Sequence, residues 1–268
     1  MLWLSDWRYN SDWRHNFMLM LTGYFDETGD LPDINRKLNG MAGFVTTTDN
    51  WFSIHQDWQE HIKTQQYNGY HDVDIRQSRK EKRRKPLLDI LERYWVIPVG
   101  FFVSMDAFYR LPLLGRVGFG NPYFNAFCMC VWVAEQGAIA NKTTGEIIRN
   151  LRIATIFDRK KERFQQQALL YYRWLAALSP RLDRILEQPA FKSSQDCIAL
   201  NMADMLAAIL REEYERQLYS PNDQLRDSYI RIVKIAEKAF VERSLGDKIP
   251  FTFLRTESDF KDFLPDDL

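Results

Sequence analysis

Short apolar runs alternate with segments of helical periodicity along most of this chain, and that order limits the fold more than any other sequence feature. Apolar runs rich in β-branched and aromatic residues predict strands, and apolar residues at i, i+3 and i+7 predict amphipathic helices. The strand-like runs lie at 17–25, 40–48, 94–104, 151–157 and 185–191. The helical patterns lie at 51–65, 79–93, 121–140, 163–178, 197–217 and 225–242. Hairpin-linked strands tend to be antiparallel and helix-separated strands parallel, so we expect an α/β fold with a mixed five-stranded sheet flanked by helices.

The same order predicts one large domain with an addition at each end. Residues 1–19 contain the sequence Ser-Asp-Trp-Arg twice without strand or helix periodicity, so we expect an N-terminal extension. It is either a docking arm with exposed tryptophans or sequence upstream of the natural start. The domain is predicted over 20–220, with a helical insertion at about 49–93 between the second and third strands. A C-terminal helix and an acidic tail are predicted over 221–268.

The charge balance and the apolar content exclude several classes of protein. The chain carries 36 Lys and Arg against 36 Asp and Glu, which rules out a uniformly basic nucleic-acid coat and an acidic tail protein. Hydrophobic residues make up 46% of the chain, which is too many for a disordered protein.

The sequence also bears on the compartment. The longest apolar run has nine residues, at 126–134, which is too few to cross a bilayer, and the first residues lack the features of a secretory signal. The three cysteines are odd in number and have no Cys-x-x-Cys spacing, which argues against a disulfide framework and a thiolate zinc site. We therefore expect a cytoplasmic protein without a membrane segment.

Three aspartates lie on elements that should be buried. Asp26 follows the first strand, Asp158 follows the fourth, and Asp204 is the only charged residue within 197–210. Taken alone, each of the first two could be a turn former or a helix cap, and Asp204 could belong to a buried pair with arginine. If the first and fourth strands are adjacent and parallel, however, their carboxyl ends meet, and a helix packed across them adds the third carboxylate. Clustered carboxylates suit magnesium or manganese.

Three motifs in the chain resemble those of a known family. Residues 24–29 (Tyr-Phe-Asp-Glu-Thr-Gly) resemble the Tyr-Ile-Asp-Glu-Ser-Gly motif of the bacterial "domain of unknown function 3800" proteins. Residues 199–207 resemble their Leu-Gln-x-Ala-Asp-Leu-Leu-Ala helix, with Asn201 at the position of the usual glutamine, and residues 157–159 fit the strand-ending aspartate between them. The resemblance covers roughly residues 20–215.

This family is similar to the ribonuclease H-like superfamily, so the resemblance implies a mixed five-stranded sheet, a carboxylate-bound pair of magnesium ions and nuclease activity. It implies four candidate site residues, Asp26, Glu27, Asp158 and Asp204.

A further carboxylate has two candidates. Asp74 belongs to a segment that resembles the His-x-x-Asp of some family members, and we favour it slightly over Glu135 as a metal ligand. His71, in the same segment, is the histidine that we would test as a proton-transfer group.

Basic residues are concentrated in two runs. Residues 79–85 hold six basic residues in seven, and residues 159–163 hold four directly after Asp158. Each run could be a solvated helix face, or it could hold a nucleic-acid backbone against the acids. The candidate contacts are Lys82, Arg83, Arg84, Arg159 and Lys160, with Lys192 after the fifth strand.

The sequence thus predicts a Mg²⁺- or Mn²⁺-dependent nuclease that acts on RNA or DNA. The alternative from another class is a non-catalytic nucleic-acid-binding or partner-docking component of a larger assembly, for example in defence. A phosphatase acting through Asp26-x-x-x-Asp30 has less support, because no second phosphatase signature follows. The aromatic-rich residues 1–19 make self-association or a larger complex plausible.

Overall fold

The computed structural model of the chain describes residues 20–28, 38–64, 75–110, 121–124, 126–131, 152–178, 187–194, 197–241 and 251–254. The strands are β1 (Met20–Glu27), β2 (Leu38–Thr47), β3 (Ile97–Ser104), β4 (Arg152–Asp158), β5 (Ala190–Lys192) and β6 (Phe251–Leu254). The helices are α1 (Thr48–Thr64), the 3-10 turn η3 (Gln77–Arg79), α2 (Lys80–Leu91), α3 (Met105–Arg110), α6 (Glu162–Leu178), α8 (Ile198–Tyr219) and α9 (Asp227–Val241).

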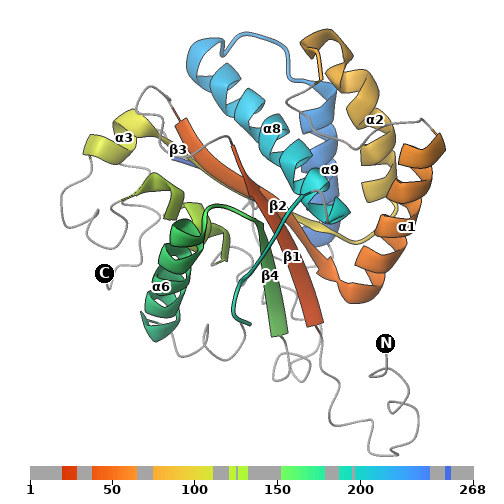
Figure 1. The fold of residues 1–268 in the computed structure, drawn as a ribbon. Helices are drawn as coiled ribbons and strands as arrows, with labels where there is room; N and C mark the ends of the chain where they lie inside the picture. Colours follow the sequence, from red (N-terminus) through yellow and green to blue (C-terminus); the bar gives the residue numbers. More distant parts are fainter. Residues whose placement is uncertain are drawn as a thin grey trace, which may run out of the picture.

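The strands form one mixed sheet in the order β5-β4-β1-β2-β3-β6, and Figure 1 shows its strands β1 to β4. The β1/β2 and β2/β3 pairs are antiparallel, whereas β1/β4, β4/β5 and β3/β6 are parallel. The α/β class and the mixed sheet of the five predicted strands are confirmed, and the first and fourth strands are adjacent and parallel, the condition on which the aspartates would meet. The sheet also contains β6, which the sequence assigned to the acidic tail because four residues are too few to show a period.

The other predicted elements are largely present. Helices α1, α2, α6, α8 and α9 closely match the predicted ranges, and α1 and α2 form the helical insertion. The fifth strand, expected at 185–191, is β5 at Ala190–Lys192, and before it the backbone N–H of Glu187 donates a hydrogen bond to the carbonyl of Ile153 on β4. The short helix α3 was not predicted. Of the helix expected at 121–140, the structure describes 122–124 and 126–131, which are helical. The predicted extension at 1–19 lies outside the described residues.

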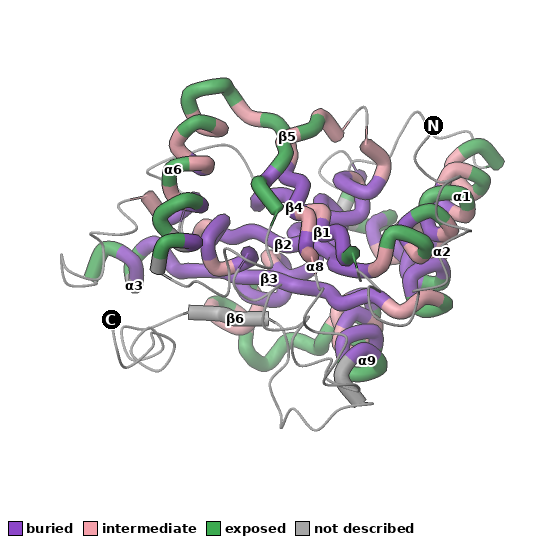
Figure 2. Tube along the Cα trace, turned by 90° about the horizontal axis from the view of Figure 1, so that it is seen from below, coloured by how far each residue is buried: buried purple, intermediate pink, exposed green. Residues whose placement is uncertain are grey.

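Each face of the sheet is covered by its own hydrophobic core, because successive strand residues point to opposite faces. On one face, Leu21 and Phe25 of β1 pack with residues 123–124 and 126–131 and with α6. On the other face, Ala42 and Phe44 of β2 pack against α1, α2, α8 and part of α9. Figure 2 shows the central strands buried along most of their length, with exposed residues on the outer sides of α1, α2 and α6.

Helix α8 lies close against the sheet and packs on β1, β2 and β3. Its residues 199–210 are almost all buried, which explains why this stretch is so apolar. A β-carbon at Gly100 of β3 would collide with the side chain of Leu210, so glycine permits the close approach. The helix therefore holds its polar residues in fixed positions relative to the strands. Among the described residues, no helix combines the length and apolarity needed to cross a membrane.

Candidate functional site

Two of the predicted aspartates are placed side by side by the pairing of β1 with β4. Phe25 is in register with Phe157, and their rings stack with centroids 5.2 Å apart. Both rings belong to the core on the α6 side of the sheet, so the residues that follow them point to the other face. Asp26 and Asp158 therefore lie at the carboxyl ends of adjacent parallel strands, on the face that α8 covers.

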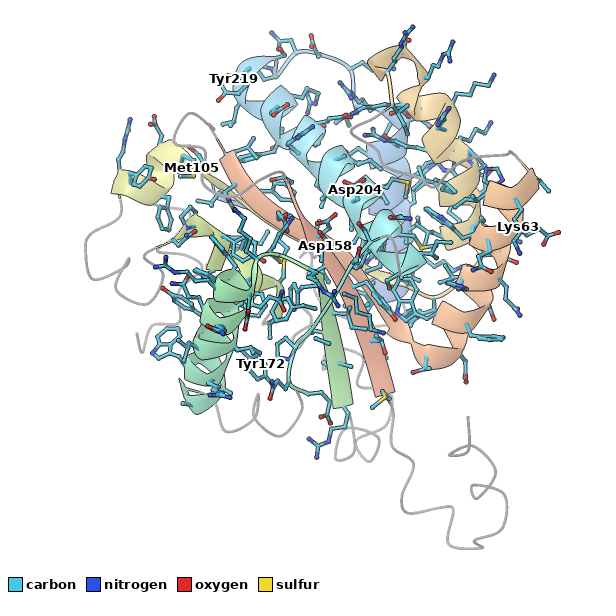
Figure 3. The ribbon with its side chains drawn as sticks, in the orientation of Figure 1. Lys63, Met105, Asp158, Tyr172, Asp204 and Tyr219 are labelled. Atoms are coloured by element: carbon cyan, nitrogen blue, oxygen red, sulfur yellow. The ribbon has the colours of Figure 1, made fainter. Side chains whose placement is uncertain are left out.

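Helix α8 brings the third aspartate to the same place. Figure 3 shows Asp158 at the end of β4 and Asp204 on α8. Asp204 and Asp26 are both buried, each with 9% of its surface exposed, and the two carboxylates interact electrostatically. The arrangement predicted from the sequence, two strand ends with a helix across them, is present.

Glu27 joins these aspartates from the opposite side of β1. As the neighbour of Asp26 it points to the α6 side of the sheet, and it is also buried. Its backbone N–H donates a hydrogen bond of 2.8 Å to Oδ1 of Asp26, which fixes the two residues relative to one another. We call the carboxylates of Asp26, Glu27, Asp158 and Asp204 the acidic cluster.

Burial and mutual repulsion make the acidic cluster hard to ionise completely. Burial raises the pKa of Asp26 well above its usual value, and the other three carboxylates raise it further, whereas Lys160 lowers it. Burial also raises the pKa of Glu27, to about 7, although Lys160 opposes the shift. At neutral pH the cluster therefore favours the binding of a cation or a proton.

Lys160 supplies one such cation from the loop between β4 and α6. Its Nζ contacts Oε1 of Glu27 and lies 3.5 Å from Oδ2 of Asp158. Burial would lower the pKa of Lys160, but Glu27, followed by the aspartates of β1 and β4, raises it above its usual value. Lys160, which the sequence suggested as a contact for nucleic-acid phosphates, thus binds carboxylates of the acidic cluster in this structure.

The donors of the acidic cluster are all carboxylate oxygens, the ligands that hard divalent ions such as Mg²⁺ and Mn²⁺ prefer. In the part of the chain that the structure describes, no three His, Cys, Asp or Glu side chains are gathered tightly enough to hold a metal ion. The ammonium of Lys160 occupies the position between Glu27 and Asp158 where a cation would meet both. The carboxylate oxygens are therefore of the type that binds a divalent ion, but in this structure the cation beside Glu27 and Asp158 is the ammonium of Lys160.

Tyr123 is a neighbour of the acidic cluster that the sequence did not indicate. It is buried, with 2% of its surface exposed, and its backbone N–H donates to Oδ1 of Asn121 at the start of its helix. Burial, followed by the three carboxylates of β1 and β4, raises the pKa of the Tyr123 hydroxyl well above its usual value. Nothing in its sequence surroundings separates it from the other aromatic residues of that helix.

Two other predicted cations lie beside the acids. Lys192 pairs with Asp158 in the register of β4 and β5, and its carbonyl accepts a hydrogen bond from the N–H of Arg159. Both side chains are exposed. The backbone N–H of Ser194 donates to Oδ1 of Asp158 at 3.1 Å, so this loop also helps to fix the carboxylate.

The cations predicted on the first basic run are on α2, and one of them has a different role. Lys82 is exposed and Arg83 half-buried, but Arg84 is fully buried and forms ion pairs with Glu212. Glu212 follows Asp204 by two turns of α8, about 12 Å along the helix axis. The expectation that Arg84 contacts nucleic acid is therefore corrected, because a fully buried guanidinium that binds a carboxylate is not available to a ligand.

The remaining predicted residues lie outside the described ranges, namely Asp74, His71 and Glu135. Searches with protein-family models and among curated proteins gave no match to this chain. The resemblance to a family therefore depends on the motifs at 24–29, 157–159 and 199–207.

Proposed function

We propose that this protein is a nuclease that hydrolyses phosphodiester bonds with Mg²⁺ or Mn²⁺ held by the acidic cluster, on a ribonuclease H-like domain. The observation that carries the proposal is the convergence of four buried or half-buried carboxylates from β1, β4 and α8. The carboxyl ends of parallel strands are where open α/β sheets place ligands. The mixed sheet and the positions of the acids agree with what the family resemblance implies.

Asp26, Asp158 and Asp204 would hold the ions, with Glu27 beside them. When bound, such ions activate water and stabilise the leaving oxygen in phosphodiester hydrolysis. The exposed side chains of Arg159 and Lys192 are next to Asp158, where they can bind the phosphates on either side of the scissile bond. Asp74 as a further ligand and His71 as a proton-transfer group are proposals from the sequence.

The test is cleavage of labelled RNA and DNA, single- and double-stranded, by the purified protein in Mg²⁺, in Mn²⁺ and in EDTA. We expect metal-dependent cleavage that Asp26→Asn abolishes. Asp106→Asn on α3 is the matched control, because that carboxylate is 86% exposed and pairs with Arg110. No cleavage under any metal condition, or equal cleavage by Asp26→Asn, would contradict the proposal.

A second function is favoured by the contact of Lys160 with Glu27 and Asp158, because an acidic cluster that already holds a lysine can be purely structural. The protein would then bind nucleic acid, or a partner in a larger assembly, without cleaving it. Binding that persists in EDTA and weakens steeply with salt, together with absent cleavage, would support this alternative.

A further inference from the structure

Lys160 connects the two sides of the acidic cluster. Glu27 points to the α6 side of the sheet and Asp158 to the α8 side, yet both lie at the same sheet edge. The ammonium of Lys160 contacts an oxygen of Glu27 and is 3.5 Å from an oxygen of Asp158. This position lets one cation reduce the repulsion between carboxylates of two strands.

A divalent ion and this ammonium compete for the same oxygens. Mg²⁺ binds carboxylate oxygens at about 2.1 Å, and Nζ is 3.5 Å from Oδ2 of Asp158, so an ion on that oxygen would lie within about 6 Å of Nζ. Like charges at that separation repel strongly inside a protein, where water screens them poorly. Metal binding at Asp158 therefore favours movement of the ammonium away from this carboxylate.

The structure gives Lys160 room to move. It lies in the three-residue connection 159–161 between β4 and α6, and 19% of its side chain is exposed. Lysine carries its charge on a flexible four-carbon stem, so the head can leave a carboxylate without a change in the backbone. The neighbouring Arg159 and Lys161 are exposed, so the ammonium has a route to the surface beside the acids.

We infer that Lys160 is a displaceable internal cation that holds Glu27 and Asp158 together until a divalent ion replaces it. The inference builds on the proposed function, because it concerns the metal that the acidic cluster would bind. It assigns Lys160 a regulatory role: the lysine stabilises the metal-free protein and weakens metal binding. A displaced Lys160 would add its charge to those of the exposed Arg159 and Lys192.

The test is the affinity for Mn²⁺, measured by isothermal titration calorimetry without nucleic acid. Lys160→Met removes the charge and keeps the length of the stem. Lys161→Met is the matched control, because it removes the same charge from the exposed adjacent position. We expect Lys160→Met to bind Mn²⁺ about tenfold more tightly than the natural chain, a typical size for coupling between two ligands, and Lys161→Met to differ by less than about twofold.

Thermal unfolding in EDTA and in Mn²⁺ gives the second measurement. We expect Lys160→Met to unfold at a lower temperature than the natural chain in EDTA and to be stabilised more by Mn²⁺. Equal Mn²⁺ affinity in all three proteins would overturn the inference and leave the proposed function standing. Absence of Mn²⁺ binding in all three would overturn both, and failure of Lys160→Met to fold even in Mn²⁺ would show that the lysine is structural.

Discussion

Two buried carboxylates on α8 lie in opposite electrostatic surroundings. Glu212 contacts Lys80 at 2.9 Å, Arg84 at 2.8 Å and also Arg226, a set of residues that we call the Glu212 cluster. Burial by itself would raise the pKa of Glu212, but the hydrogen bonds and charges of Arg84 and Lys80 lower it below its usual value. Asp204, eight residues earlier, lies near the carboxylate of Asp26, and repulsion between the two helps to raise the pKa of Asp26.

The difference separates a structural ion pair from a binding site. The Glu212 cluster joins the start of α2 and the segment before α9 to α8, so its charges are matched by the fold itself. In the acidic cluster, repulsion between the carboxylates persists in the folded protein. Buried groups with unfavourable electrostatics are typical of functional sites. A bound ligand or proton can reduce the repulsion between the carboxylates that remains in the folded protein.

The largest expected effect on stability comes from Glu212. Glu212→Gln removes the negative charge from among buried cations, and breaking a buried ion pair in this way costs about 3–5 kcal/mol of unfolding free energy. Asp26→Asn should cost less than about 1 kcal/mol, because it removes a charge that Glu27, Asp204 and Asp158 all repel. Urea unfolding measures both, with Glu237→Gln at an exposed position of α9 as the control. Equal losses for Glu212→Gln and Asp26→Asn would remove the distinction between the two regions.

For activity we expect the opposite: substitutions in the acidic cluster should have larger effects than substitutions in the Glu212 cluster. Under the proposed function, Asp204→Asn removes an anionic ligand and should lower kcat/KM for cleavage by about 100-fold or more, while the protein stays folded. Glu215→Gln, an exposed acid further along α8, should cleave as the natural chain does. Cleavage by Asp204→Asn at more than about a tenth of the natural rate would mean that this carboxylate has no part in the reaction.

The two regions should also respond oppositely to pH. The pKa of Glu27 rises to about 7 on folding, so the folded protein binds that proton more tightly than the unfolded chain. Protonation of Glu27 therefore stabilises the folded protein. Its contribution to the free energy of unfolding is complete below about pH 4.5 and decreases by roughly 1–3 kcal/mol as the pH rises through about 7. Glu212 has a lowered pKa, so its contribution is present above about pH 4.5 and is lost as the pH falls through its folded pKa.

Urea unfolding in EDTA from pH 4 to pH 8 measures this dependence. Glu27→Gln stays neutral at every pH, so its stability should change less between pH 4.5 and pH 7 than that of the natural chain. A natural chain whose stability rises steadily across that interval would contradict the sign expected from Glu27.

The sequence located the acids because they end strands or interrupt an apolar helix, and these patterns can be read locally. The pairing of β1 with β4 and the position of α8 entered the sequence analysis only as a condition, and the structure meets that condition. The sequence could not show which way the cations point. Lys80 and Arg84 lie one turn apart on one face of α2 and are buried against Glu212, whereas Lys82 is exposed between them, although all three belong to the same basic run.

The positions of Lys160 and Tyr123 also depend on tertiary structure. Lys160 lies between two exposed basic residues, and only the meeting of β1 with β4 brings Glu27 within its reach. Tyr123 lies close to the acids because its helix packs on the α6 side of the sheet. Contacts of this kind join segments that are distant in sequence, so neither hydrophobic periodicity nor a sequence motif can predict them.

The smallest expected effect concerns the basic residues that flank the two regions. Arg159 is exposed next to Asp158, and Lys82 is exposed on α2 beside the Glu212 cluster, so the two test which region nucleic acid covers. Arg159→Ala should weaken binding of an oligonucleotide in EDTA by about two- to fourfold and lower the slope of log K against log salt by about 1, the loss of one phosphate contact. Lys82→Ala should change neither quantity. If Lys82→Ala weakened binding as much as Arg159→Ala, nucleic acid would also lie along α2. The region of the Glu212 cluster would then be part of the binding surface, in addition to joining α2 to α8.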